Sequence, residues 1–198
     1  MQLNVHQYIP VTKVEGPGIR ACIQVQGCPI RCNGCAVPFT WPENGGIARD
    51  VNELAESILN TDGIEGVTFL GGEPFAQAEA LAMLGRLLRH EGLSVMTFTG
   101  YVYEDLVASN NQHYSDLIAV TDLLVDGPFQ KENLDTSRPW VGSSNQRYHF
   151  LTDRYLYLQD KLLDIPNRLE VRLGTDGRVM VNGLAELTDL EYLFGKLM

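Results

Sequence analysis

The sequence lacks the features that would tie it to a membrane or to export. No uninterrupted apolar stretch approaches the roughly 20 residues that a membrane-spanning helix needs. The initial stretch, MQLNVHQYIP, carries neither the basic region nor the apolar core of a signal peptide. We therefore expect a cytoplasmic protein with no membrane partner, in which cysteines stay reduced unless a metal holds them.

Basic residues are also scarce. The 198 residues include 15 lysines and arginines against 25 aspartates and glutamates, which leaves a net charge of −10. A surface of this sign repels a phosphate backbone, so we expect no nucleic-acid partner and favour a small specific ligand or a protein partner. The length and the apolar content of 44% are ordinary for a globular chain, and we expect a single domain over residues 1–198.

Cysteine is sparse and unevenly placed. Cys28, Cys32 and Cys35 lie close together, Cys22 precedes them, and no cysteine follows Cys35. Structural zinc usually takes four ligands in two close pairs, and a disulfide is disfavoured in the cytoplasm. An iron–sulfur cluster matches better, because cysteine thiolates at short, uneven spacings can wrap one cluster. Three ligands hold three irons and leave the fourth iron open to a small molecule.

Cys22 leaves a second interpretation open. Residues 18–26, GIRACIQVQ, alternate apolar and polar side chains, which predicts a strand that contains Cys22. As a fourth ligand, Cys22 would close the cluster and make an electron-transfer centre. Free cysteine is commonly buried, and we favour a core position for Cys22.

Strand and helix patterns alternate after the cysteines. Asp50 is suited to cap a helix that begins beside it, with Glu53 completing a pair like a capping box. The further predicted elements are a strand at 66–70, a helix at 77–91, a strand at 94–99, a short helix at 102–109 and a strand ending near Val125. This order indicates an α/β fold with parallel strands, as an open sheet or a partial barrel. The loops after the four strands should converge on one mouth, since ligand sites gather at the carboxyl ends of parallel strands.

The last quarter of the chain has a different pattern. Residues 126–140 look irregular, YHFLTDRYLYL alternates weakly, and RLEVRLGTDGRVMVNGLA predicts a hairpin turned at residues 175–177. Leu187, Leu190, Leu193 and Phe194 suggest a closing helix. We interpret residues 148–198 as an antiparallel extension of the core.

The stretch CPIRCNGC, residues 28–35, resembles the C-x3-C-x2-C signature of the radical S-adenosylmethionine (SAM) enzymes. The resemblance implies a partial (open) parallel βα barrel with a short C-terminal hairpin and helix extension. It implies one [4Fe–4S] cluster on Cys28, Cys32 and Cys35, whose open iron is chelated by S-adenosylmethionine. One electron then cleaves the sulfonium and releases a 5′-deoxyadenosyl radical that abstracts hydrogen. GGEP, residues 71–74, ends the second strand as the motif that binds the amino group of SAM does in this family, with glycines that allow close approach.

Further motifs resemble the branch that activates glycyl-radical enzymes, most closely the type that serves anaerobic ribonucleotide reductase. The motifs are EGPGIR at 15–20, Thr40-Trp41 after a Gly34 that replaces the usual aromatic, TGY at 99–101, DGxF at 126–129 and GSxNQ at 142–146. The resemblance covers residues 15 to about 147. It implies that the SAM site is built from this set: Gly34, Ala36, Gly71, Gly72, Glu73, Pro74, Thr99, Asp126 and Asn145.

This branch implies a glycyl-radical enzyme as the partner and an external flavodoxin- or ferredoxin-like electron donor. It requires no catalytic side chain beyond the cluster ligands. Two alternatives stay open: a single-cluster radical SAM enzyme that acts on a small molecule or peptide, and the closed-cluster electron carrier. Auxiliary clusters are excluded, because they need cysteines after Cys35.

Overall fold

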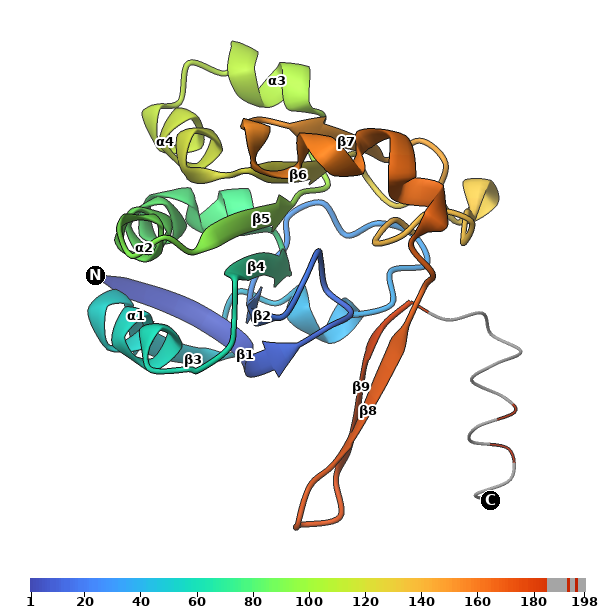
Figure 1. Ribbon diagram of the computed structural model, residues 1–198, viewed down its shortest axis with the longest axis horizontal. Coiled ribbons are helices and arrows are strands. Elements are labelled where there is room, and N and C mark those ends of the chain that lie inside the picture. Colours follow the sequence, from blue (N-terminus) through green and yellow to red (C-terminus); the bar gives the residue numbers. More distant parts are fainter. Residues whose placement is uncertain (185–191, 193–194, 196–198) are drawn as a thin grey trace.

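The computed structural model describes residues 1–184, 192 and 195 as a mixed α/β fold built on one seven-stranded sheet (Figure 1). The strand order is β3-β1-β2-β4-β5-β6-β7. The four central strands run parallel: β2 (Arg20–Val25), β4 (Gly66–Gly71), β5 (Ser94–Phe98) and β6 (Leu123–Asp126). Three antiparallel strands complete the two sides: β1 (Gln2–Thr12), β3 (Ile47–Asp50) and β7 (Arg147–Phe150).

Three helices cover one face of the sheet: α1 (Val51–Leu59), α2 (Ala78–His90) and α4 (Gln112–Val120). Their buried side chains form one apolar core with alternate residues of the parallel strands, such as Ile23, Phe69 and Val95. The Asp50 carboxylate caps α1 by accepting from the backbone amides of Asn52 at 2.8 Å and Glu53 at 3.4 Å. The predicted strands and helices of the βα units are confirmed, including the short α3 (Tyr103–Ala108).

Sequence patterns missed the antiparallel strands β1 and β3, and they missed α4. Strand β1 alternates imperfectly, because its pairing with β2 is irregular between Val5 and Gln7 and again between Ile9 and Thr12. β3 has only 4 residues and is mostly exposed. α4 buries only Leu117 and Val120, so its apolar stripe is narrow, although the Asn111 side chain caps it.

The C-terminal extension packs on the other face of the sheet. The segment YHFLTDRYLYL is part strand and part helix: β7 pairs with β6, and the 3-10 helix η4 (Asp153–Asp164) follows. η4 buries Tyr155 and Leu158 against Met96, Leu123 and Val125. The remaining short 3-10 helices are η1 (Pro38–Thr40), η2 (Pro74–Gln77) and η3 (Lys131–Asn133).

The predicted hairpin is confirmed as β8 (Leu169–Leu173) and β9 (Val179–Gly183), which form a separate two-stranded sheet. Figure 1 shows it projecting from the body of the molecule. Its base is fastened to the end of β1, where the Glu170 carboxylate accepts from the Thr12 hydroxyl at 2.9 Å and the Lys13 amide at 2.8 Å. The predicted closing helix over Leu187, Leu190, Leu193 and Phe194 lies outside the described residues.

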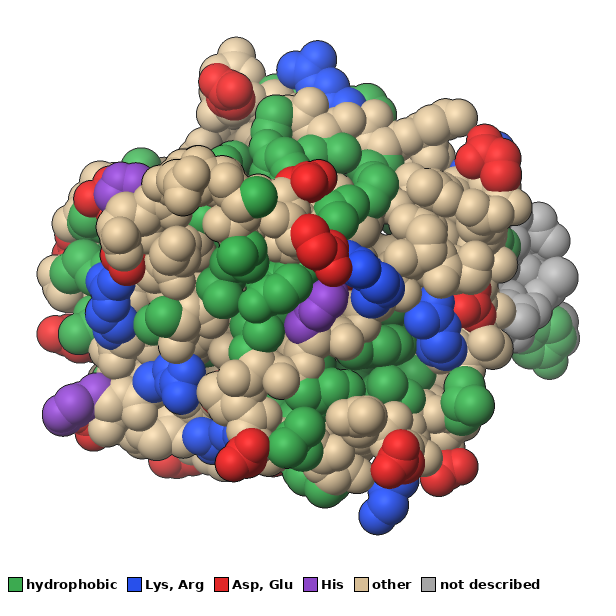
Figure 2. All heavy atoms as spheres, turned by 90° about the horizontal axis from the view of Figure 1, so that it is seen from above, with side chains coloured by type: hydrophobic (Ala, Val, Ile, Leu, Met, Phe, Trp, Pro, Cys, Tyr) green, Lys and Arg blue, Asp and Glu red, His purple; other side chains and the backbone are tan. Residues whose placement is uncertain are grey.

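The surface agrees with the composition. Figure 2 shows acidic and basic side chains interspersed with apolar ones over the face seen from above. No helix in the described part of the chain has the length and apolar content needed to cross a bilayer.

We expect the contact between η4 and the sheet to contribute strongly to stability. Leu158→Ala removes a side chain that is 8% exposed, and a cavity of this kind costs roughly 2–5 kcal/mol. Leu156→Ala, on the same segment but 44% exposed, is the matched control and should change stability by about 0.5 kcal/mol or less. Urea unfolding followed by circular dichroism measures both, and equal effects would show that η4 does not depend on this contact.

Candidate active site

A cavity of about 140 Å³ lies at the carboxyl ends of the four parallel strands. The loops after β2, β4, β5 and β6 all contribute to it, which confirms the predicted convergence of these loops on one mouth. Its walls combine three thiols, one carboxyl group, several glycines and a set of apolar side chains. The lining residues are Cys28, Ile30, Cys32, Cys35, Thr40, Trp41, Gly71, Gly72, Glu73, Pro74, Phe98, Thr99, Gly100, Gly127, Phe129 and Gln146.

The cysteine loop is closed at its base by backbone hydrogen bonds. Gly27 donates to the carbonyl of Thr40 at 2.8 Å, and Cys28 donates to the carbonyl of Trp41 at 3.1 Å. Cys28 is buried, while Cys32 and Cys35 are half-buried and reachable from solvent. The Cys35 sulfur accepts from the Val37 amide at 3.4 Å. The loop therefore presents three thiols to one space from a fixed frame.

The three thiols suit a cluster better than a single ion. In the described part of the chain, no three histidine, cysteine, aspartate or glutamate side chains are placed to share one metal ion. A zinc ion needs its thiolates gathered around one point at about 2.3 Å, whereas in a cluster each cysteine binds its own iron. Burial raises the pKa of the Cys32 thiol, partly offset by a backbone hydrogen bond from Phe129, and the neighbouring Cys28 and Cys35 raise it further. Iron binding would remove that proton.

The GGEP turn lies against the end of β2. Gly72 donates to the carbonyl of Val25 at 2.7 Å, and Glu73 donates to the carbonyl of Gly27 at 2.9 Å. A Cβ atom on Gly72 would lie 2.3 Å from the Gly27 carbonyl oxygen, and Gly71 has a φ of +106°. Only glycine allows this approach, which brings the glutamate beside the first cysteine.

Glu73 is 1% exposed, and its carboxyl group is held by three donors. One oxygen accepts from the Phe75 amide at 2.9 Å and the Thr99 hydroxyl at 2.8 Å, and the other accepts from the Gly100 amide at 2.8 Å. Burial raises the pKa of Glu73 to about 7, because these neutral donors only partly replace lost hydration. A cation bound in the cavity would favour the ionised form.

Of the predicted SAM-site residues, Gly71, Gly72, Glu73, Pro74 and Thr99 line the cavity, together with the three cysteines. The structure does not bring Gly34, Ala36, Asp126 or Asn145 to its wall. Gly34 and Ala36 are exposed, and a Cβ atom on Gly34 would lie 3.3 Å from the ring of Phe129, which lines the cavity. A contact of Gly34 or Ala36 with a bound cofactor stays a prediction.

Asp126 is fully buried but is engaged by the protein itself. Its carboxylate accepts from the Arg147 guanidinium and from the Tyr103 amide at 2.7 Å, and His149 Nε2 lies 3.2 Å away. Burial opposes ionisation, but hydrogen bonds from Arg147, the Tyr103 amide and His149 outweigh it and hold the pKa of Asp126 below its ordinary value. Asp126 thus fastens the end of β6 instead of facing the cavity.

Asn145 ties down the loop after β6. Its side-chain nitrogen donates to the Pro128 carbonyl at 2.8 Å, and its buried side-chain oxygen has no hydrogen-bond partner in the described structure. The neighbouring Gln146 lines the cavity, and its side-chain oxygen accepts from the Gly142 amide at 2.8 Å.

Several lining residues were not predicted as ligand contacts. Ile30, Phe98 and Phe129 supply apolar wall, and Gly100 and Gln146 supply polar backbone and side-chain groups. Gly100, Phe129 and Gln146 belong to the sequence motifs TGY, DGxF and GSxNQ. Membership in these motifs was the sequence signal that could have identified them as lining residues. Phe98 is the last residue of β5, and nothing in the sequence separates it from an ordinary strand residue.

Trp41, predicted only as part of a motif, also lines the cavity. Its indole nitrogen is buried and has no hydrogen-bond partner in the described structure. An orphaned donor in a cavity wall is costly unless a ligand accepts from it. The wall therefore fits a bound cofactor that carries acceptor groups.

Cys22 lies apart from this site. It is fully buried within β2, where it pairs with Ile9 of β1 and Thr68 of β4, and it is absent from the cavity wall. Burial raises the pKa of its thiol well above the ordinary value. Its place within the sheet, away from the other three thiols, fits the core position that the strand pattern predicts.

Comparison with known proteins agrees with this site. The family model for a 4Fe-4S single cluster domain matches residues 14–149. The anaerobic ribonucleoside-triphosphate reductase-activating protein of Escherichia coli K12 is 34% identical over 157 residues, which cover 75% of this chain and 99% of that protein. The proteins of the same name from Vibrio cholerae and from Enterobacteria phage T4 are 33% and 31% identical, over 76% of this chain and 99% and 96% of theirs. A solved structure of QueE from Escherichia coli matches with a TM-score of 0.43 and 22% identity, over 50% of this chain and 53% of that one.

The fold, the thiol-lined cavity and the family match define a radical SAM enzyme, with one [4Fe–4S] cluster and S-adenosylmethionine as cofactors. The cavity residues fit these groups, because three thiols, a buried carboxyl group and an orphaned indole donor surround one space. The chain belongs to the family of anaerobic ribonucleoside-triphosphate reductase-activating proteins.

The raised pKa of Glu73 predicts a pH-dependent stability of the cofactor-free protein. The native state keeps the proton up to about pH 7, whereas the unfolded chain releases it near the ordinary value of 4.5. The native state therefore binds more protons in this window, and stability should fall by about 3 kcal/mol as the pH rises from 4.5 through 7. Urea unfolding from pH 5 to pH 8 measures this change.

The control for this experiment is Glu73→Gln, which cannot titrate and should remove most of the decrease. A wild-type stability that stays flat across the window would contradict the assignment of the raised pKa to Glu73.

Proposed function

We propose that this enzyme generates a glycyl radical on a partner enzyme of the anaerobic ribonucleotide reductase type. The observation that supports this most is the meeting of the cysteine loop, the GGEP turn and the loops after β5 and β6 around one cavity. When bound, the cluster and S-adenosylmethionine supply a 5′-deoxyadenosyl radical that takes hydrogen from a glycine Cα. The names of the curated relatives describe activation of such a reductase.

In this proposal, Cys28, Cys32 and Cys35 bind three irons of the cluster. Glu73 accepts a hydrogen bond from the ammonium group of S-adenosylmethionine, since its carboxyl group is the one acidic group among the lining residues. Gly71 and Gly72 keep the backbone near enough for that contact. The indole nitrogen of Trp41 donates to an acceptor on the cofactor.

Other residues act by positioning these groups. Thr99 and the Gly100 amide hold the Glu73 carboxyl group in place through hydrogen bonds of 2.8 Å. Asp126, together with Arg147, fixes the end of β6, so that Gly127 and Phe129 reach the wall. Ile30, Phe98 and Phe129 limit the entry of water, which protects a radical from side reactions.

The finer architecture follows from the same proposal. In this proposal, β2, β4, β5 and β6 with their helices form the wall of a partial (open) parallel βα barrel, which continues into the short C-terminal extension. Residues 1–198 form a single domain, with a core at about 15–147 and an extension at about 148–198. The electron comes from an external flavodoxin- or ferredoxin-like protein in the cytoplasm, where the thiols stay reduced.

The cluster assignment predicts different outcomes for the four cysteines. After anaerobic reconstitution with iron and sulfide, Cys28→Ala, Cys32→Ala and Cys35→Ala should each lose the cluster absorption and the release of 5′-deoxyadenosine. Cys22→Ala is the matched control in β2. It should keep its iron content within about 20% of wild type, because in this proposal Cys22 does not bind the cluster. Loss of the cluster in Cys22→Ala would instead support a closed electron-transfer centre.

The partner assignment predicts a protein radical. Reduction of the reconstituted enzyme with S-adenosylmethionine and an anaerobic ribonucleotide reductase should give the doublet of a glycyl radical by paramagnetic resonance. A reductase whose glycine is replaced by alanine is the control and should give no such signal. Release of 5′-deoxyadenosine without any radical on the reductase would favour a small molecule or peptide as the substrate.

A further inference from the structure

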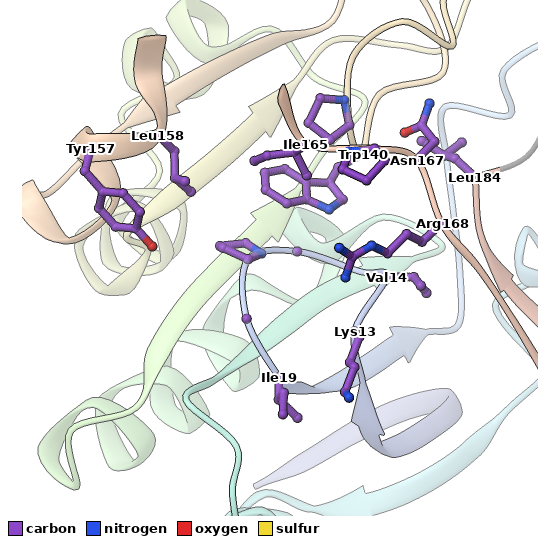
Figure 3. A pocket seen from close by; sticks show the side chains of 15 residues that line it. Lys13, Val14, Ile19, Trp140, Tyr157, Leu158, Ile165, Asn167, Arg168 and Leu184 are labelled. Atoms are coloured by element: carbon purple, nitrogen blue, oxygen red, sulfur yellow. The ribbon is translucent and has the colours of Figure 1, made fainter. Parts of the chain in front are cut away.

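A second and larger cavity, of about 400 Å³, lies at the end of the sheet where β2 begins. Three segments that are far apart in sequence form it: the loop before β2, the turn before β7, and the chain from η4 into β8 (Figure 3). It shares no lining residue with the thiol-lined cavity. Its volume falls in the range of small-molecule sites, and its wall is mostly apolar with a few polar groups, as such sites require.

Trp140 occupies the wall in a strained backbone conformation. Its φ is +64°, which is rare for a bulky aromatic residue. Its indole ring lines the cavity, where Figure 3 shows it between Ile165 and Arg168. Strain of this kind persists where surrounding contacts enforce it, and it is typical of ligand sites.

The wall is also rigid. Pro17, Pro139 and Pro166 each fix one backbone dihedral along it. The side-chain nitrogen of Asn167 donates to the Thr136 carbonyl, which ties the segment before β8 to the loop before β7. A wall ordered before binding loses little conformational entropy when a ligand enters.

Arg168 brings a positive charge to this cavity. Figure 3 shows its side chain extending into the space below the indole of Trp140. No acidic side chain within the described residues pairs with it, whereas Arg172 and Arg178 of the same hairpin pair with Glu170 and Asp176. Among the described residues, Arg168 is therefore an arginine at a mostly apolar cavity wall without an acidic partner. Its guanidinium presents donors that match a phosphate or a carboxylate.

We propose that this cavity binds a small anionic aromatic molecule, whose ring stacks on Trp140 and whose charged group is held by Arg168. Lys13, at the rim, adds positive charge. A nucleotide and an aromatic carboxylate share this chemistry. The site is separate from the thiol-lined cavity, because the two cavities share no lining residue.

Calorimetric titration of the reconstituted, full-length enzyme tests the proposal. S-adenosylmethionine is kept at saturation, so that the thiol-lined cavity is occupied by its cofactor. The probes are ATP, indole-3-acetate and inorganic tripolyphosphate, which has the charge without the ring. We expect ATP or indole-3-acetate to bind at least tenfold more tightly than tripolyphosphate, and the tighter of the two identifies the source of the ligand.

Three variants locate the binding. Arg168→Gln should weaken the preferred probe about tenfold or more, by loss of a charge-assisted pair of hydrogen bonds. Trp140→Asn, which tolerates a positive φ, should weaken it about fivefold or more without affecting tripolyphosphate. Arg178→Gln, at the exposed tip of the hairpin, is the matched control and should stay within twofold of wild type.

Failure of both aromatic probes to bind would overturn the proposal. So would binding that Arg168→Gln leaves unchanged, or binding of tripolyphosphate as tight as that of ATP. Circular dichroism of each variant confirms that the fold is retained. Because the readout is binding, these results are independent of whether a glycyl radical forms on any partner.

Discussion

The close contact between the GGEP turn and the end of β2 is the constraint on which the site depends. Two backbone hydrogen bonds join them, from Gly72 to Val25 and from Glu73 to Gly27, and no side chain fits between. Parallel strands bring their carboxyl ends to one edge, but this contact brings the glutamate beside the cysteine loop itself. A cofactor that contacts both the cluster iron and the Glu73 carboxyl group needs these two groups at a fixed separation. The backbone contact between the GGEP turn and the end of β2 sets that separation.

Two buried carboxyl groups lie at the carboxyl ends of β4 and β6, the two strands on either side of β5, and behave in opposite ways. Glu73 is surrounded by neutral donors, so burial raises its pKa to about 7. Asp126 contacts the Arg147 guanidinium, and its pKa is lowered despite burial. The protein therefore uses its own cation to neutralise one acid and leaves the other for a cation from outside. This difference supports the proposal that Glu73 contacts the ammonium group of the cofactor, while Asp126 fastens the end of β6.

The C-terminal extension gives the sheet a second packed face. η4 covers the strands on the side away from α1, α2 and α4, and the larger cavity forms where η4 and the hairpin meet the loop before β2. The curated relatives are covered almost to their full length by about three quarters of this chain. Residues of the extension form one part of that cavity, and the loop before β2 and the turn before β7 form the rest.

The sequence by itself determined the features that depend on local spacing: the cluster of three cysteines, the glycine turn, the βα units and the hairpin. Each is recognised from residues only a few positions apart. Tertiary structure alone decided which strand-end groups face the cavity, because those pairings join distant residues. Thr99 meets Glu73 26 positions away, and Arg147 meets Asp126 21 positions away, as the register of the parallel and antiparallel strands dictates. No local pattern encodes that register, so the motifs alone did not show that Asp126 would pair with Arg147 and Asn145 with the Pro128 carbonyl.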